Sequence, residues 1–265
     1  MPQLYIVEGL PCSGKSSTAQ FIAGKLTANG QTVTCVDEGS GNHPADYEFH
    51  AYVSDSNLML FTEQLQAQIR ECSEHISGGY IVPLAHFEGD AFNSLLQYKI
   101  YDFLPWETEM PLMLDKWRSF VKNAEDNTVY IFNCVLLQNP MCETMMRFGF
   151  SEEQSFAYIS EIAQIIKPLE PLVIYLSNND TAKSVTETAK ERDGWLEAVI
   201  DYHTNGEYGK SINAHGFDGY IACLEERQRR ELSILGRLAL KSVIIDNTDR
   251  DWNGTHRKVL DLIGL

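Results

Sequence analysis

Lysine and arginine are scarce in this sequence. They total 21 of 265 residues against 37 aspartates and glutamates, which gives a formal net charge of −16 at pH 7. A polyanion such as duplex DNA would meet net repulsion over most of such a surface. We therefore expect no nucleic-acid partner, and any anionic ligand must be held by a local positive site.

Long apolar runs and clustered cysteines are also missing. The most apolar stretch near the start, Leu4–Val7, is too short for the core of a signal peptide, and nothing approaches the roughly 20 apolar residues that span a bilayer. The six cysteines form no C-x-x-C pair and no Cys/His cluster at zinc-ligand spacing, which argues against a disulfide framework and a structural zinc. We expect a cytoplasmic protein with no membrane partner.

What is present is the composition of an ordinary folded protein, with 44% hydrophobic and 22% charged residues. Short apolar or β-branched stretches predict strands, with helical spacing between them. The five expected strands are Leu4–Val7, Thr32–Val36, Thr128–Phe132, Pro171–Leu176 and Ser242–Ile245. We expect a helix at about Asp55–Ile76 and further helices up to Asn127, because Pro83 argues against a central strand at Tyr80–Leu84.

This alternation of strands and helices predicts an α/β fold. Parallel neighbouring strands need crossover connections, so the pattern implies a three-layer αβα arrangement around a five-stranded parallel sheet. We expect a single domain over residues 1–265, with a helical region at about 48–127 and a lid with its following helix at about 193–240. Ligands of such sheets bind beyond the carboxyl ends of the strands.

A phosphate loop follows the first strand. Residues 9–16 match G-x-x-x-x-G-K-[ST] and open the first helix. The loop's N–H groups would point at phosphate oxygens, and the helix N-terminus adds about half a positive charge. Lys15 would bridge the β- and γ-phosphates, and Ser16 would offer its hydroxyl to Mg²⁺, so we predict ATP and Mg²⁺ as cofactors. The expected nucleotide contacts are Gly9, Pro11, Cys12, Ser13, Gly14, Lys15, Ser16 and Ser17.

Two other classes of phosphate-loop protein lack support. The guanine-reading N-K-x-D motif of GTPases has no match, because the nearest candidate, residues 178–181, lacks both the lysine and the aspartate in register. No D-x-x-G follows the third strand. An ATP-driven motor would show an apolar strand ending in acidic residues, yet the third strand ends in Asn133 and Cys134.

Three further segments stand at strand or helix ends. They are Asp37-Glu38-Gly39 after the second strand, Lys190-Glu191-Arg192 after the fourth, and Ile245-Asp246-Asn247-Thr248 at the fifth. With the phosphate loop they resemble the nucleoside and nucleotide kinase group of P-loop phosphotransferases, in particular deoxynucleoside kinases and thymidylate kinase. The resemblance implies the sheet order 2-3-1-4-5, an acceptor over the second and third strand ends, and a helical lid with an arginine. It also places Asn247 at the nucleotide.

Glu38 is the predicted catalytic base. A carboxylate beyond the second strand could reach both Mg²⁺-bound water and an acceptor hydroxyl beside the γ-phosphate. Asp37 is the fallback for this role, and Ser16, Asp37 and Glu38 are the predicted metal ligands. The alternative is that both carboxylates are ordinary loop residues of an acidic protein.

Several arginines offer positive charge to the phosphates. Arg192 is expected to stabilise the transferred phosphoryl group, or else to pair with the end of its helix. Residues 193–217 form either a mobile cover for the site or a disordered surface loop. Arg227 and Arg230 lie either on a solvated helix face or toward the phosphates.

The acceptor side carries aromatic and amide side chains. Tyr101, Trp106, Trp117 and Arg118 line an acceptor pocket or belong to the core. Gln138 and Asn139 could hydrogen-bond an acceptor. Asn133 stands where the resembling kinases usually carry an acid.

The sequence therefore predicts a P-loop kinase, an ATP- and Mg²⁺-dependent phosphotransferase that acts on a small-molecule acceptor. Nucleosides and nucleotides are the leading class of acceptor. The alternatives are a non-catalytic ATP-binding regulator, in which Asn133 marks lost chemistry, and a slow ATPase. A homodimer is left open.

Overall fold

The computed structural model describes residues 3–265, which divide into two compact units. The first comprises the described residues up to Glu38 together with Phe120–Leu265, and the second comprises Gly39–Ser119. The sequence predicted one domain over 1–265 with a helical region at about 48–127. No helix within residues 3–265 has the length and apolarity that a membrane crossing needs.

The first unit is built on a five-stranded parallel sheet. Its strands are β1 (Leu4–Gly9), β2 (Thr32–Val36), β6 (Thr128–Asn133), β7 (Leu172–Ser177) and β8 (Lys241–Asp246). The order β2-β6-β1-β7-β8 is 2-3-1-4-5 when these five strands are counted along the chain, so the predicted order is confirmed. The three inner strands are buried throughout, which explains their almost continuous apolar sequences.

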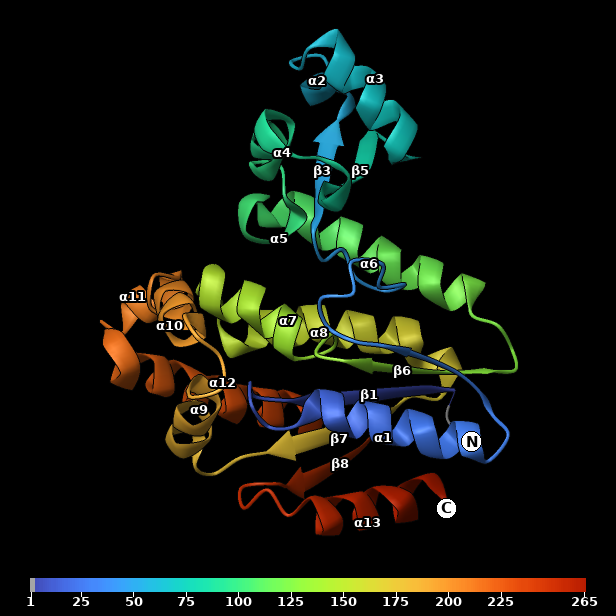
Figure 1. Cartoon of the computed structure of the whole chain (residues 1–265), viewed down its shortest axis with the longest axis vertical. Coiled ribbons are helices and arrows are strands. Elements are labelled where there is room, and N and C mark those ends of the chain that lie inside the picture. The colour runs from blue at the N-terminus through green and yellow to red at the C-terminus, as the bar shows by residue number, and fades with distance from the viewer. Residues whose placement is uncertain (1–2) are drawn as a thin grey trace. The chain divides into compact units, whose positions relative to one another are not determined.

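Helices cover both faces of this sheet (Figure 1). On one face, α1 (Lys15–Ala28) and α13 (Trp252–Ile263) share a core with alternate side chains of the strands, such as Tyr5 and Val7 of β1. On the other face, α12 (Gly216–Arg237) reaches β7, where the hydroxyl of Tyr175 donates to Glu231 at 2.6 Å. This face also holds α7 (Gln138–Met141), the π-helical segment η2 (Cys142–Arg147), α8 (Glu152–Ile166) and the turn η3 (Lys167–Leu169). The predicted αβα layers are confirmed.

Three short helices follow β7 along the chain. They are α9 (Thr181–Ala189), α10 (Trp195–Thr204) and α11 (Glu207–Ser211). Apolar side chains of α10, including Trp195 and Val199, pack against a core that contains Leu10 and Leu224. The disordered-loop alternative for residues 193–217 is therefore wrong, because this segment has apolar surface to bury and buries it.

The second unit contains a three-stranded antiparallel sheet that the sequence analysis did not predict. Its order is β3 (His50–Ser54), β5 (Gly79–Pro83) and β4 (Glu74–Ile76). Around it lie α2 (Asp55–Leu58), α3 (Glu63–Cys72), η1 (Leu84–His86), α4 (Gly89–Leu96), α5 (Ile100–Phe103) and α6 (Trp106–Asn123).

Two secondary-structure predictions fail in this unit. The expected helix over 55–76 is interrupted because the hydroxyl of Thr62 accepts from the N–H of Leu65 and starts a new helix there. Pro83 does belong to a central strand. It is the last residue of β5, and β4 pairs only with Gly79–Ile81, so no neighbour on that side needs the missing N–H.

Candidate active site

The phosphate loop joins β1 to α1 at the carboxyl edge of the sheet. Gly9 and Gly14 have φ angles of 142° and 93°, a region that side chains disfavour. A Cβ atom on Gly9 would collide with the carbonyl of Leu176 on β7, and one on Gly14 would enter the ring of Trp252. Both positions therefore require glycine, which explains why these two residues of the motif are fixed.

Lys15 and Asn247 stabilise the loop in different ways. The Lys15 side chain is folded over the loop, where Nζ donates to the carbonyl of Leu10 at 2.8 Å. Asn247 donates from Nδ2 to the carbonyl of Ser13 at 2.9 Å, and its Oδ1 accepts from Thr255 at 2.9 Å. Asn247 thus stabilises the loop from a position outside the cavity lining.

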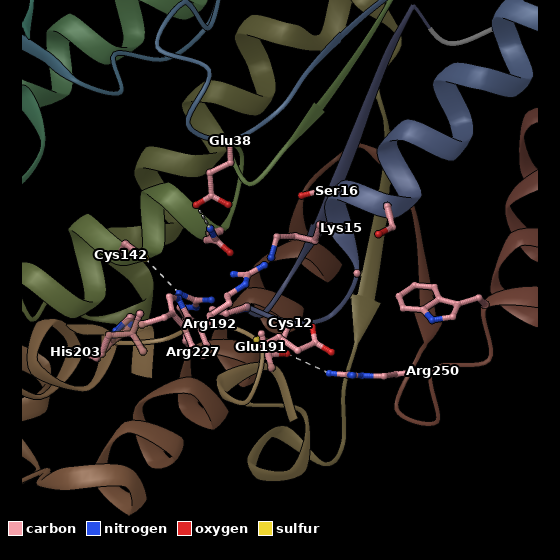
Figure 2. A pocket seen from close by; sticks show the side chains of 18 residues that line it. Cys12, Lys15, Ser16, Glu38, Cys142, Glu191, Arg192, His203, Arg227 and Arg250 are labelled. Carbon is pink, nitrogen blue, oxygen red and sulfur yellow. Dashed lines mark hydrogen bonds between the residues drawn. The ribbon is translucent and has the colours of Figure 1, made fainter. Parts of the chain in front are cut away.

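A cavity of about 510 Å³ opens in front of the loop, entirely within the first unit (Figure 2). Of the residues predicted for the site, it is lined by Pro11, Cys12, Gly14, Lys15, Ser16, Ser17, Glu38 and Arg192. Gly9, Ser13, Asp37 and Asn247 are not among its lining residues. Arg227, predicted either on a solvated face or toward the phosphates, also lines it. Lining residues that the sequence did not assign to the nucleotide include Gln138, Cys142, Glu191, His203, Arg250 and Trp252.

Glu38 has a fixed orientation in this cavity. Its carboxylate accepts from the Cys134 thiol at 3.1 Å and from the Gln138 amide at 3.0 Å. Burial, above all, raises the pKa of Cys134 well above its usual value, so the thiol stays protonated and can donate. The carboxylate therefore faces the same cavity as Lys15 and Ser16 from a held position (Figure 2).

Asn133, at the end of β6, connects the predicted metal ligands. Its Oδ1 accepts from the backbone N–H of Glu38 at 2.9 Å. Its Nδ2 lies 3.2 Å from the hydroxyl of Ser16 and 3.5 Å from a carboxylate oxygen of Asp37. An ionised acid at this position could not donate to either group. These two contacts explain why an amide stands at position 133.

The oxygen donors at this edge suit a magnesium ion that arrives on phosphates. Mg²⁺ is usually bound by one or two protein oxygens together with water and substrate phosphates. Ser16 and Asp37 share the Asn133 amide, and Glu38 follows Asp37 directly. Among residues 3–265, no group of three or more His, Cys, Asp and Glu side chains is arranged to enclose a metal. The donor set therefore fits an ion held partly by the nucleotide.

Arg227 on α12 is a buried cation in the cavity wall. Only 1% of it is exposed, and its Nε lies 3.1 Å from Oε1 of the fully buried Glu231. Its Nη1 donates to the sulfur of Cys142 at 3.2 Å. The solvated-face alternative is therefore wrong for Arg227. Arg230 instead donates to Glu226 at 2.8 Å and to the carbonyl of Phe150 at 3.0 Å, away from the cavity lining.

Glu8, the penultimate residue of β1, is a buried carboxylate that the sequence analysis overlooked. It accepts from the backbone N–H groups of Leu136, Leu137 and Gln138 at 2.8, 3.1 and 3.1 Å. Burial and the nearby charge of Glu231 raise its pKa to about 7, against the effect of these hydrogen bonds. Glu8 thereby fixes the turn that presents Gln138 to Glu38. The available signal was an acid inside an otherwise apolar strand.

Arg192 lies in the turn after α9, which ends at Ala189. Its guanidinium lies 5.7 Å from the ring centre of Trp195, and the side chain is exposed. Arg250 is more constrained, because it lies 3.2 Å from Glu187 and also donates to the carbonyl of Ser184. Arg192 is therefore the less constrained of these two cations.

The aromatic residues expected at an acceptor pocket lie in the second unit. Trp117 is 1% exposed and belongs to the core, so the core alternative holds for it. This unit has a cavity of its own, of about 520 Å³, whose walls include Tyr47, Tyr52 and Lys116. Tyr101, Trp106, Trp117 and Arg118 are not among its lining residues.

No protein-family model matches this chain, and no curated protein sequence does. Among solved structures, the thymidylate kinase from Candida albicans matches with a TM-score of 0.45 and 14% identity, over 99% of this chain and 91% of that chain. The YorR protein of Bacillus subtilis, in complex with phosphorylated GDP, matches with a TM-score of 0.43 and 12% identity, over 99% and 96%. These are distant likenesses, so the P-loop kinase-like fold is assigned from the sheet order and the phosphate loop.

Proposed function

We propose that this protein is an ATP- and Mg²⁺-dependent phosphotransferase, a P-loop kinase that acts on a small-molecule acceptor. The supporting observation is that Lys15 and Ser16 of the phosphate loop line one cavity with the held carboxylate of Glu38. A phosphate loop alone also serves switches and motors. A fixed carboxylate beside it is what transfer to a hydroxyl requires.

The phosphate loop would bind the triphosphate. Its backbone N–H groups and the N-terminus of α1 suit phosphate oxygens, and Lys15 would exchange its bond to Leu10 for the β- and γ-phosphates. Figure 2 shows Arg250 and Glu38 on opposite sides of the loop. The nucleotide would therefore lie on the side of Arg250 and the acceptor beside Glu38.

Glu38 would remove the proton from the acceptor hydroxyl as the oxygen attacks the γ-phosphorus. The new oxygen–phosphorus bond forms while the bond between the γ-phosphorus and the bridging oxygen breaks, which releases ADP. Lys15 and Arg192 would stabilise the charge on the transferred group. Mg²⁺, held by Ser16 together with Glu38 or Asp37, would supply further charge neutralisation on the phosphates.

The test is an ADP-release assay with Mg·ATP and a panel of hydroxylated metabolites, nucleosides and nucleotides. We expect release that depends on the acceptor, with Lys15→Ala as the variant that loses ATP binding. Glu38→Gln should lose transfer and keep ATP affinity. Tight ATP binding without turnover would instead identify a regulator, and release of phosphate without an acceptor would identify an ATPase.

A further inference from the structure

One wall of the cavity contains buried polar atoms without a hydrogen-bond partner. Nε of Arg227 is one of them, although it lies 3.1 Å from the carboxylate of Glu231. The other three are Nη2 of Arg227, Nε2 of His203 and Oε1 of Gln138. The three side chains are 1%, 5% and 6% exposed. Buried polar atoms of native proteins nearly always have partners. A wall with three unpartnered atoms in a cavity therefore points to a polar ligand.

His203 contributes a hydrogen-bond acceptor to this wall. Its Nδ1 lies 2.8 Å from the carbonyl oxygen of Val199, which can only accept, so Nδ1 carries the proton. Burial and the charge of Arg227 lower the pKa of His203 to about 4. The ring is therefore neutral at pH 7, and Nε2 needs a donor from the ligand.

The wall has no uncompensated positive charge. Glu231 lies 3.1 Å from Arg227 and balances it. Burial raises the pKa of Cys142 to about 11, so its thiol is neutral too. Because Arg250 is paired with Glu187 at 3.2 Å, the unpaired cations among the described lining residues are Lys15 and Arg192.

Lys15 would be occupied by the triphosphate and Arg192 by the phosphoryl group during transfer, and ATP carries more negative charge than these two side chains can offset. A second phosphate, on the acceptor, would have no free cation in this wall and would lie near the carboxylate of Glu38. Two neighbouring negative charges repel strongly when they are partly removed from water. The electrostatics therefore disfavour a phosphorylated acceptor.

We propose that Gln138, His203 and Arg227 bind an uncharged, hydroxyl-bearing acceptor, and that the site selects against acceptors that already carry a phosphate. Hydroxyl groups donate to Oε1 of Gln138 and Nε2 of His203 and accept from Nη2 of Arg227. This inference rests on the proposed function, since it names the class of acceptor for the same transfer.

The first test does not require the acceptor to be known. Inorganic phosphate is titrated by calorimetry into protein saturated with Mg²⁺ and a non-hydrolysable ATP analogue. We expect no saturable phosphate binding by the native protein. Glu231→Gln removes the charge that balances Arg227 and should create phosphate binding, whereas Glu226→Gln on the same helix, which loses pairs with Arg229 and Arg230, should not. Saturable binding by the native protein that Arg227→Met abolishes would overturn the proposal.

The second test compares each hydroxylated compound with its own phosphomonoester in the ADP-release assay. We expect kcat/KM to be at least about tenfold higher for the uncharged member of a productive pair, equivalent to about 1.4 kcal/mol. A higher kcat/KM for the phosphorylated member would overturn the proposal even if Glu231→Gln fails to fold. Failure to bind the ATP analogue would instead overturn the proposed function, so the two failures are distinguishable.

Discussion

The side-chain oxygen of Asn133 accepts a hydrogen bond from the backbone N–H of Glu38 at 2.9 Å. The ends of β6 and β2 are thus joined through an amide, and the same side chain donates toward Ser16. These hydrogen bonds give Asn133 a structural role of its own, at a position where the resembling kinases usually carry an acid.

Asn133→Asp should therefore lower the turnover number rather than restore it. The aspartate cannot donate to Ser16, and it adds a carboxylate beside Asp37, so we expect kcat to fall about tenfold, the equivalent of one lost hydrogen bond. Steady-state kinetics with Asn93→Asp, an exposed control in the second unit, provide the measurement. A rise in kcat would show that Asn133 replaces a catalytic acid and that this replacement impairs the reaction.

Glu8 should make stability depend on pH. Its pKa is raised to about 7 in the folded protein from 4.5, so the folded state binds more protons between these values, and stability falls as pH rises through that window. The full effect is about 3 kcal/mol. The glutamine of Glu8→Gln cannot ionise. The free energy of unfolding of this variant in urea should therefore differ less between pH 5 and pH 7.5, each roughly at one end of the window, than that of the native protein does.

The control for Glu8 is Glu71→Gln, an exposed glutamate on α3. It should retain the pH dependence of the native protein. An unchanged pH dependence in Glu8→Gln would contradict the assignment of this titration to Glu8.

Gly14→Ala should weaken ATP binding, because its φ of 93° strains a side chain and the added methyl group would meet the ring of Trp252. We expect a loss of roughly 1–3 kcal/mol in stability and at least a tenfold loss of ATP affinity by calorimetry, about 1.4 kcal/mol. Gly24→Ala is the matched control. It lies on α1 with open space around its Cβ position, so helix propensity should add up to about 1 kcal/mol of stability.

The sheet of the first unit was predictable because its inner strands have almost continuous apolar runs and its phosphate loop has a specific pattern. The small sheet of the second unit was not, since β4 has three residues, too few for a periodic signal. Arg227 and Glu231 were hidden for another reason. They stand in a dense charge run that looks solvated, yet they continue the buried stripe of Leu224 along α12. Only the helix register against the sheet distinguishes a buried pair from an exposed one.

Arg192→Ala tests whether the charge of Arg192 stabilises the transferred phosphoryl group. Within residues 3–265 the exposed guanidinium contacts the ring of Trp195 and forms no ion pair, so it can approach a phosphoryl group that becomes more negative during transfer. Loss of such a group commonly costs about 100-fold in kcat, and we expect that loss with ATP affinity changed less than about threefold, or 0.7 kcal/mol. Lys190→Ala, an exposed cation two positions earlier, should leave both quantities unchanged. Equal losses in the two variants would indicate a general effect of surface charge and not a role for Arg192 in the transition state.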